Sequence, residues 1–335
     1  MTNFVKRVLD AGGSITPLII PAEFTNGTGT FNPSIYNDNG NLYCNIRHCQ
    51  VTIYHSELNK FEHQWGPLSY LNPENDVTLT TTNYFCEIGD DMLIKKFHKV
   101  NFDKLNQTPM WEFIGLEDCR VFRWEGKLYL CGVRRDTTTN GQGRMELSEI
   151  EIDDSGVREI SRFRIPTPDG GTDVNKGSYC EKNWMPVLDL PYHFVKWCNP
   201  TEVVRVDPET KTSKTVHLGE PVPQNLDYRG GSQVITLGEY RVAITHQTYL
   251  FNSDAGRKNA TYRHNFIVWD KNWNVLLYSA PFAFLDTAIE FCTGMTQYGD
   301  DLLITFGVQD NAAYILRVPM RFIVEYLNES LNKKA

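Results

Sequence analysis

The sequence has no long uninterrupted apolar run. Its first twenty residues, MTNFVKRVLDAGGSITPLII, contain no stretch long enough for a signal peptide, and no later segment is apolar enough to span a membrane. We therefore expect a soluble protein and assign it to the cytoplasm.

Paired cysteines are also missing. Eight cysteines are spread along the chain, but none forms a C-x-x-C pair, and no two histidines have the spacing of zinc ligands. For a cytoplasmic chain this favours reduced thiols packed as small apolar side chains. We expect neither a disulfide framework nor a metal site.

Several catalytic and cofactor motifs are absent as well. The chain has no Gly-x-Gly-x-x-Gly after a strand, no phosphate-binding G-x-x-x-x-G-K-[ST] loop and no G-x-S-x-G elbow. It also lacks Asp-x-Asp, the sequence that holds a metal and a nucleotide-sugar in many glycosyltransferases. No cofactor is predicted, and dependence on Mg²⁺ is disfavoured.

A surplus of basic residues is not present either. Lys and Arg total 33 against 41 Asp and Glu, which gives a net charge of −8. The surface as a whole is therefore unsuited to nucleic acid. A basic rim around one opening would still accept a nucleic-acid substrate, and that alternative stays open.

The sequence does contain many short apolar runs separated by Gly, Asn and Asp, the pattern of an all-β protein. Only residues 320–332, MRFIVEYLNESLN, have helical spacing. A short C-terminal helix is therefore the one helix that we predict.

A repeated template predicts the architecture. Five segments share a polar start, an apolar strand, a tight turn and a second apolar strand, and each is followed by further β-rich sequence. The repeats begin near residues 32, 117, 181, 230 and 290. This pattern predicts a five-bladed β-propeller with a short C-terminal helix, in a single domain over residues 1–335. A pair of β-sandwiches is the alternative.

Polar residues at the strand starts are the candidate functional residues. In a propeller the first strand of each blade lines the central channel, so its starting residues converge at one opening, joined by the ends of the second strands. Ionisable groups there are costly unless they pair with one another or bind a ligand. The predicted set is Asn32, Arg47, His48, Glu117, Asp118, Arg120, Arg134, Arg135, Glu181, Lys182, Asn183, Lys196, Ser232, Gln233, His246 and Glu290.

Three further segments have compositions suited to a ligand. The segment 134–144, RRDTTTNGQGR, couples arginines to a polar loop that suits sugar hydroxyls or phosphate oxygens, or is simply a solvated hairpin. Arg229 precedes two glycines that allow close approach to the backbone. Tyr262 and His264 are two residues apart, so in a strand they lie on the same face. They are either a stacking platform for a sugar ring or core residues.

The stretch GLEDCRVF at Gly115–Phe122, with EKNWMPV downstream at Glu181, resembles glycoside hydrolase family 130. This family comprises five-bladed propellers that act as β-mannoside phosphorylases and hydrolases, together with mannosyltransferase relatives. Its Gly-x-Glu-Asp-Pro-Arg motif matches Gly115–Arg120, except that Cys119 replaces the proline. The blade pattern covers residues 30–320, whereas the specific motifs cover only a few dozen residues.

The resemblance implies a mechanism in which Asp118 is the single catalytic proton carrier. Arg120 and Lys182 are placed in an anion cradle by motif, and Arg134 and His246 are added to it as candidates. In the phosphorolytic direction Asp118 acts as general acid while phosphate attacks the anomeric carbon. In the reverse direction it acts as general base toward an acceptor hydroxyl.

Four functional hypotheses follow. The leading one is a glycosyltransferase that moves a sugar from a nucleotide-sugar or sugar-phosphate donor to a hydroxyl acceptor. The alternatives are an inverting β-mannoside phosphorylase that uses free phosphate and a non-catalytic carbohydrate-binding propeller. A hydrolase ranks lower because it needs a second carboxylate, for which Glu181 and Glu290 are the candidates.

Overall fold

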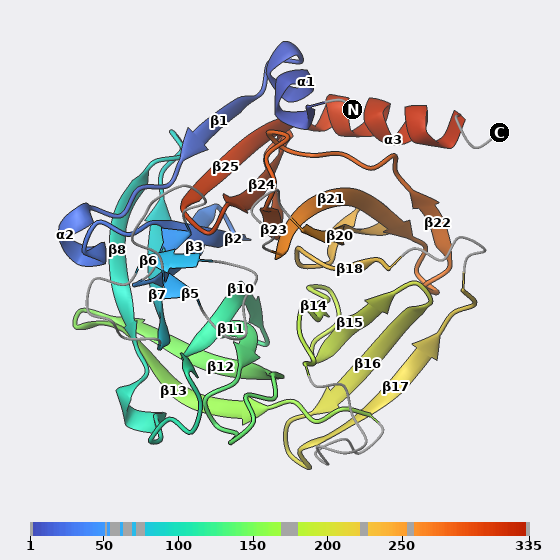
Figure 1. The fold of residues 1–335 in the computed structure, drawn as a ribbon. Helices are drawn as coiled ribbons and strands as arrows, with labels where there is room; N and C mark the ends of the chain where they lie inside the picture. The colour runs from blue at the N-terminus through green and yellow to red at the C-terminus, as the bar shows by residue number, and fades with distance from the viewer. Residues whose placement is uncertain are drawn as a thin grey trace.

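The protein is an all-β propeller with a C-terminal helix, as predicted (Figure 1). The computed structural model describes residues 3–50, 52–53, 61–62, 69–71, 78–168, 180–221, 227–252 and 258–332. In this part of the chain the long strands form five four-stranded antiparallel units, arranged around a common centre. This is the arrangement expected of a propeller with five blades.

The first two units are joined into one sheet, because β13 pairs in parallel with β8. Unit 1 contains β2 (Thr30–Asp38), β3 (Asn41–Cys49), β7 (Leu79–Ile88) and β8 (Ile94–Asn101). Unit 2 contains β10 (Leu116–Trp124), β11 (Lys127–Arg134), β12 (Arg144–Asp153) and β13 (Gly156–Arg164). Short elements between them are β4 (Thr52–Ile53), β5 (Phe61–Glu62), β6 (Ser69–Leu71), the 3-10 helix η1 (Asp103–Leu105) and β9 (Phe113–Ile114).

The remaining units complete the ring. Unit 3 contains β14 (Met185–Pro186), β15 (His193–Cys198), β16 (Thr201–Asp207) and β17 (Thr212–Leu218). In unit 4, β18 (Arg229–Gly230) and β19 (Ile235–Leu237) both pair with β20 (Tyr240–Asn252), followed by β21 (Lys258–Trp269) and β22 (Val275–Tyr278). Unit 5 contains β23 (Glu290–Tyr298), β24 (Asp301–Val308) and β25 (Ala312–Pro319), with β1 (Ser14–Pro17) at its outer edge.

Tight turns join the first two strands of units 1 and 2, as the sequence indicates. Asn39 and Gly40 both have positive φ, 52° and 99°, which is the conformation of a type I′ hairpin turn. Glu125 and Gly126 repeat it with φ values of 49° and 77°. Because these turns lie at one end of the first strands, the polar starts of those strands lie at the other end.

The hydrophobic core is divided among the interfaces between neighbouring units. One cluster joins units 1 and 5, a second units 1 and 2, a third units 2 and 3, and a fourth units 3 and 4. The fifth joins units 4 and 5 and includes side chains from two helices. Each sheet therefore buries both faces, which explains why many strands are continuous apolar runs.

Three α-helices lie outside the ring of sheets in the described part of the chain. Helix α3 (Met320–Asn332) has the bounds that the sequence predicts, and its buried face contains Phe322, Ile323 and Tyr326. Helix α1 (Phe4–Asp10) was not predicted; its first turn is capped by Asn3, whose side chain accepts a hydrogen bond from Lys6 N at 2.9 Å. The one-turn helix α2 (Ala22–Thr25) leads into β2.

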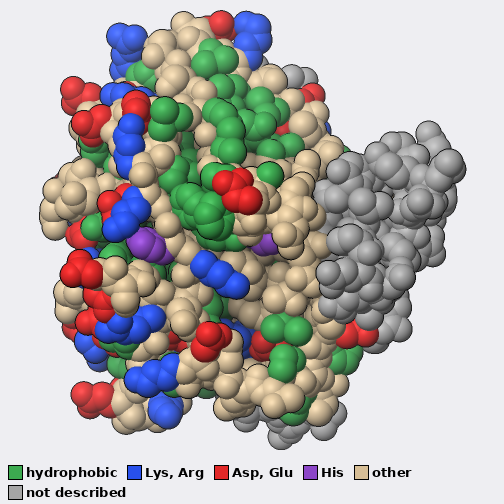
Figure 2. Space-filling view, turned by 90° about the vertical axis from the view of Figure 1, so that its left-hand side faces the viewer, with side chains coloured by type: hydrophobic (Ala, Val, Ile, Leu, Met, Phe, Trp, Pro, Cys, Tyr) green, Lys and Arg blue, Asp and Glu red, His purple; other side chains and the backbone are tan. Residues whose placement is uncertain are grey.

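The outer surface carries charges of both signs. Figure 2 shows the side of the molecule on which β8 and α2 lie, and there Lys and Arg side chains lie among Asp and Glu side chains, while apolar side chains gather in the upper middle of the view. The acidic side chains visible on this side therefore form no single patch.

Candidate active site

Three first strands begin with an Asn or Asp in the left-handed backbone conformation. Asn32, Asp118 and Asn183 come at the corresponding point of units 1, 2 and 3, with φ values of 47°, 50° and 63°. In β2 and β10 the residue lies within an irregularity of the strand register. Asn and Asp tolerate this conformation better than other non-glycine residues, and such bulges redirect a side chain at the edge of a sheet.

The carboxylate of Asp118 is held through one of its two oxygens. Asn32 Nδ2 and Arg47 Nη1 each donate a hydrogen bond to Asp118 Oδ1 at 2.8 Å. The other oxygen receives no hydrogen bond from the residues that the structure describes. Burial raises the pKa of Asp118, but the Arg47 charge, the two hydrogen bonds and the Arg120 charge outweigh it, so the pKa is lowered. Asp118 is therefore a fixed carboxylate with one oxygen available.

Glu117 lies beside Asp118 between two arginines. Arg47 Nη2 is 3.1 Å from Glu117 Oε2, and Arg135 Nε is 3.3 Å from Glu117 Oε1. Arg135 also donates to the Gly141 carbonyl at 3.3 Å and to the Cys180 sulfur at 3.1 Å. The side chains of Arg47, Glu117 and Arg135 are 11–13% exposed, so this is a recessed cluster that solvent still reaches.

Arg120 has a different role from the predicted one, which was to bind an anion. It is 1% exposed, and its guanidinium donates to the carbonyl oxygens of Gly231, at 2.7 and 2.9 Å, and of Asp118, at 2.8 Å. A longer contact reaches Asn183 Oδ1 at 3.4 Å. Its donors are directed at the backbone, so Arg120 fixes the left-handed bulge that carries Asp118.

His246 and Tyr262 form a stacked pair of rings near this cluster. Their rings stack at 5.5 Å between centroids with an interplanar angle of 14°. His246 Nδ1 is 3.0 Å from the Gly230 carbonyl, which can only accept, so Nδ1 carries the proton and Nε2 is an acceptor. Burial and the charges of His264, Lys182, Arg229 and Arg120 hold the pKa of His246 well below its usual range, so the ring is neutral.

Two further cations of the predicted set, Lys182 and Arg229, lie near His246. Lys182 is exposed, and the described residues offer it no ion-pair partner. The Arg229 guanidinium is 2.8 Å from an Asp227 oxygen, in a largely exposed pair. Both cations contribute to the lowered pKa of His246, which places them on the same side of the molecule as the histidine.

Sequence reasoning missed Asp310, which follows β24 and has φ +47°. Burial and the charges of Asp118 and Glu117 raise its pKa to about 6, against the opposing charges of Arg47 and Lys182. Its charge also contributes to the raised pKa of Tyr262, about 12, for which burial is the main cause. The sequence does contain a pattern that points to Asp310. Candidate residues were taken from the ends of the second strands in other repeats, and the corresponding point of the fifth repeat is Gln309–Asp310.

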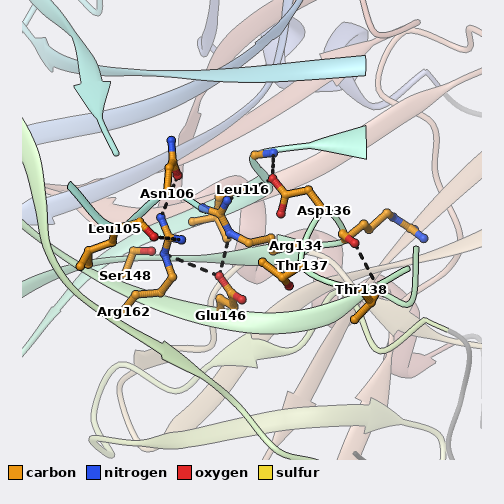
Figure 3. Close-up of polar contacts among 12 residues, drawn as sticks. Leu105, Asn106, Leu116, Arg134, Asp136, Thr137, Thr138, Glu146, Ser148 and Arg162 are labelled. Atoms are coloured by element: carbon orange, nitrogen blue, oxygen red, sulfur yellow. Dashed lines mark hydrogen bonds and ion pairs between the residues drawn. The ribbon is translucent and has the colours of Figure 1, made fainter. Parts of the chain in front are cut away.

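Several predicted site residues do not reach this cluster. Arg134 forms a buried ion pair with Glu146 (Figure 3). Glu181 accepts a hydrogen bond from Trp184 Nε1 at 3.1 Å. Fully buried Glu290 accepts from three backbone amides at 2.6–2.9 Å.

Three more are used inside the fold. Gln233 and Ser232 are fully buried and hydrogen-bonded to backbone groups. His264 is also fully buried, and its pKa is lowered to about 3, mainly by burial.

His48 and Lys196, which were also expected at the opening, have partners elsewhere. His48 Nε2 lies 2.7 Å from the Thr28 hydroxyl, and Lys196 lies 3.7 Å from Glu202. In the described residues no three His, Cys, Asp or Glu side chains gather as a metal site. None of the described helices is both long and apolar enough to cross a membrane.

No protein-family model matches the sequence, and no curated protein matches it. Solved structures do match the fold, and they include mannoside phosphorylases of glycoside hydrolase family 130, so the resemblance inferred from Gly115–Arg120 is confirmed at the level of the fold. The sequence identities, 12–14%, carry the comparison no further than the fold.

Three of these structures are representative. One, described with the family 130 mannoside phosphorylases and with hydrolases that target β-1,2-mannosidic linkages in Candida mannan, has a TM-score of 0.59 and 14% identity, over 91% of this chain and 93% of that one. A β-1,2-mannobiose phosphorylase from Listeria innocua has a TM-score of 0.53 and 13% identity, over 90% and 92%. A mannose phosphorylase from Leishmania mexicana, in complex with phosphate, has a TM-score of 0.50 and 12% identity, over 96% and 93%.

Proposed function

We propose that the protein is a carbohydrate-active enzyme that transfers a glycosyl group from a phosphate-bearing donor to a hydroxyl acceptor. The observation that carries the proposal is the state of Asp118, a carboxylate with Oδ1 bound by Asn32 and Arg47 and the other oxygen available. Its lowered pKa favours the basic form, which is the form that a general base for an acceptor hydroxyl needs.

The proposed step uses Asp118 as the only proton acceptor. The acceptor hydroxyl gives its proton to the available oxygen of Asp118 while its own oxygen bonds to the anomeric carbon. The bond between that carbon and the phosphate oxygen breaks, and the electron pair leaves with the phosphate. Attack from the face opposite the leaving group inverts the anomeric centre.

The anionic leaving group calls for fixed cations nearby. Lys182 is the strongest candidate, because the described residues give it no ion-pair partner. Arg135 and Arg47 both pair with Glu117 and are partly exposed. Arg229 is the more exposed cation. Guanidinium and ammonium groups bind phosphate well in such a recessed site. Tyr262, which stacks on the buried His246 and is partly exposed, offers a flat ring against which a sugar ring can pack.

A phosphorylase that uses free phosphate is the second candidate. It is supported by the fold shared with two phosphorylases, one of them solved with phosphate. In that direction Asp118 has to be protonated before it donates to the departing oxygen, and its lowered pKa makes this form scarce at neutral pH. The balance therefore favours transfer.

Asp118→Asn tests the proposal. Asparagine has the same shape and tolerates the left-handed conformation, so the fold and the donor affinity should persist while turnover falls about 1000-fold. Turnover and thermal stabilisation are measured with phosphate, sugar-1-phosphates and nucleotide-sugars, with glycans, small alcohols and single-stranded DNA as acceptors.

Asp207→Asn is the matched control, since Asp207 lies in the β16–β17 turn at the opposite end of the strands. Stabilisation by a nucleotide-sugar without phosphate supports the transferase, and stabilisation by phosphate or sugar-1-phosphate alone supports the phosphorylase. If no compound stabilises the protein, or if Asp118→Asn turns over like the wild type, the enzyme proposal is wrong and a carbohydrate-binding propeller takes its place.

A further inference from the structure

Next to Arg135 in the chain begins a mostly buried group of charges that we call the rear ion cluster: Arg134, Asp136, Glu146, Arg162 and Arg164. Figure 3 shows the first four of these side chains. Arg134 Nε donates to Glu146 Oε2 at 2.8 Å, and Arg134 Nη1 is 3.3 Å from Asp136 Oδ2. Arg164 Nε is 3.2 Å from the other oxygen of Glu146. The side chains of Arg134, Asp136 and Glu146 are only 3–8% exposed.

This cluster is bonded to the backbone that leads into the Asp118 strand. Gly115 N donates to Asp136 Oδ2 at 2.8 Å, the same oxygen that faces Arg134. The Asp136 carbonyl accepts from Met110 N at 2.8 Å. Gly115 has φ +96°, and a Cβ there would lie 2.8 Å from the Thr81 carbonyl, so the backbone at this point is closely confined. Asp136 therefore fixes the chain three residues before Asp118.

The cluster also anchors the residues on both sides of Arg135. Arg134 and Asp136 extend into the rear ion cluster, whereas Arg135 lies between them in sequence and extends to Glu117 and Cys180. Two anchored neighbours leave the backbone of Arg135 little freedom. In this segment Arg134 and Asp136 are therefore fixed in the rear ion cluster, and Arg135 between them belongs to the candidate site.

Buried ion pairs are an inefficient source of stability. Desolvation offsets much of their attraction, and well-packed apolar residues in their place are often as stable or more so. The rear ion cluster is more readily understood as a device that sets geometry. A displacement of about 1 Å at an active site can reduce turnover about 100-fold.

We propose that Arg134 and Asp136 are positioning residues, which hold Arg135 and the Glu117–Asp118 pair in their working arrangement through the backbone. The inference rests on the proposed function for its effect on turnover, but its structural part is independent of that function. It replaces the prediction that Arg134 binds the substrate.

Asp136→Asn tests the positioning role in turnover. The amide keeps the size of the side chain but removes the charge that Gly115 N and Arg134 share. We expect kcat to fall about tenfold or more, while the KM for the donor stays within about threefold. Glu159→Gln is the matched control, because Glu159 is 1% exposed and paired with Arg162 in the same unit but has no bond to the Asp118 strand. It should lose similar thermal stability and keep its kcat.

Alkylation of Cys180 provides a measurement that needs no substrate. Cys180 is partly exposed and the other seven cysteines are buried, so the rate of reaction with iodoacetamide in the folded protein reports on this thiol. Arg135→Gln calibrates how far the rate changes when the guanidinium is removed from the sulfur. Asp136→Asn should change the rate at least threefold in the same direction, and Glu159→Gln should leave it at the wild-type value.

The inference is overturned if Arg135→Gln changes the alkylation rate and Asp136→Asn does not, or if Arg135→Gln itself has no effect. It is also overturned if Asp136→Asn and Glu159→Gln lower kcat equally, since that indicates a general structural role. A wild-type protein inactive with every donor contradicts the proposed function alone, and the alkylation rates then decide the positioning role.

Discussion

At the scale of single residues, the pKa values of the two aspartates of the candidate site are shifted in opposite directions. The guanidinium of Arg47 and the amide of Asn32 stabilise the charged form of Asp118. Burial and then the neighbouring carboxylates favour the neutral form of Asp310, to whose side chain the described residues offer no hydrogen bond. Divergent pKa values of this kind, at one opening, are typical of sites that handle protons and anions.

Asp310 should make the stability of the protein fall as the pH rises. Its pKa is about 6 in the folded protein and 3.8 in an unfolded chain, so between these values the folded state binds more protons. The free energy of unfolding therefore decreases through this window, and the loss is complete above about pH 6. Asp310→Asn removes the penalty and also tolerates the positive φ. It should melt roughly 2–4 °C above the wild type at pH 8 and equal it at pH 4.

Differential scanning calorimetry at the two pH values measures this difference. Glu125→Gln is the control, because Glu125 also has a positive φ but lies in the β10–β11 turn at the far end of the strands. Its melting temperature should differ from the wild type by the same amount at both pH values. An Asp310→Asn difference that is equal at pH 4 and pH 8 contradicts the raised pKa.

At the scale of secondary-structure elements, the N-terminal segment closes the ring. Strand β1 pairs with β25 and so supplies the outer strand of the last unit, far from β23–β25 in sequence. Helix α1 inserts Phe4, which is 1% exposed and stacks on Phe282 with centroids 4.3 Å apart. The segment therefore provides both a strand edge and a side chain to the core between units 4 and 5.

Removal of residues 1–17 should abolish stable folding. The segment buries Phe4, Val5 and Val8, worth about 1.5–3 kcal/mol each, and loss of β1 also exposes the edge of β25. The sum approaches the whole stability of a typical domain, about 5–15 kcal/mol. Chemical denaturation should show the truncated chain largely unfolded or aggregated, and a peptide of residues 1–21 added in trans should restore the transition. Leu9→Ala, on the exposed side of α1, is the control, and truncation with an unchanged midpoint would contradict this assignment.

At the scale of the whole molecule, one glutamine connects four of the five units. Gln233 of unit 4 is fully buried, and its Nε2 lies 2.8–3.1 Å from Ser34 Oγ, the Ile35 carbonyl and the Val121 carbonyl. Its Oε1 accepts from Met295 N of unit 5 at 3.1 Å. Gln233 was predicted among the substrate- or phosphate-binding residues at the channel opening, whereas it joins the centre of the propeller through polar contacts.

Gln233→Leu should destabilise the protein by about 3–5 kcal/mol. The leucine fits the volume but leaves several buried backbone groups without a partner, at about 1–3 kcal/mol each. Urea titration measures the change, and Gln297→Leu, on an exposed side chain that bonds only to the Gly299 carbonyl among the described residues, should cost less than about 0.5 kcal/mol. A loss below 1 kcal/mol for Gln233→Leu would show that the units hold together without this residue.

Much of the fold follows from local patterns in the sequence. The repeated strand-turn-strand template, the Asn39-Gly40 turn and the periodicity of Met320–Asn332 predict the propeller and its helix, because turn chemistry and side-chain periodicity act over a few residues. The motif at Gly115–Arg120 likewise locates Asp118. That residues 1–335 form one domain, and that the protein is cytoplasmic, remain predictions.

Only the tertiary structure decides which of the polar residues face one another. Side chains alternate between the two faces of a strand, so of the consecutive pair Arg134 and Arg135 one enters the rear ion cluster and the other the candidate site. The left-handed bulge at Asp118 changes that alternation locally. The sequence by itself determined the repeats, the turns, the C-terminal helix and the motif. Three features depend instead on interactions between distant segments, which local patterns do not encode. They are the pairing of β1 with β25 that closes the ring, the central position of Gln233, and the charge interaction of Asp310 with Asp118.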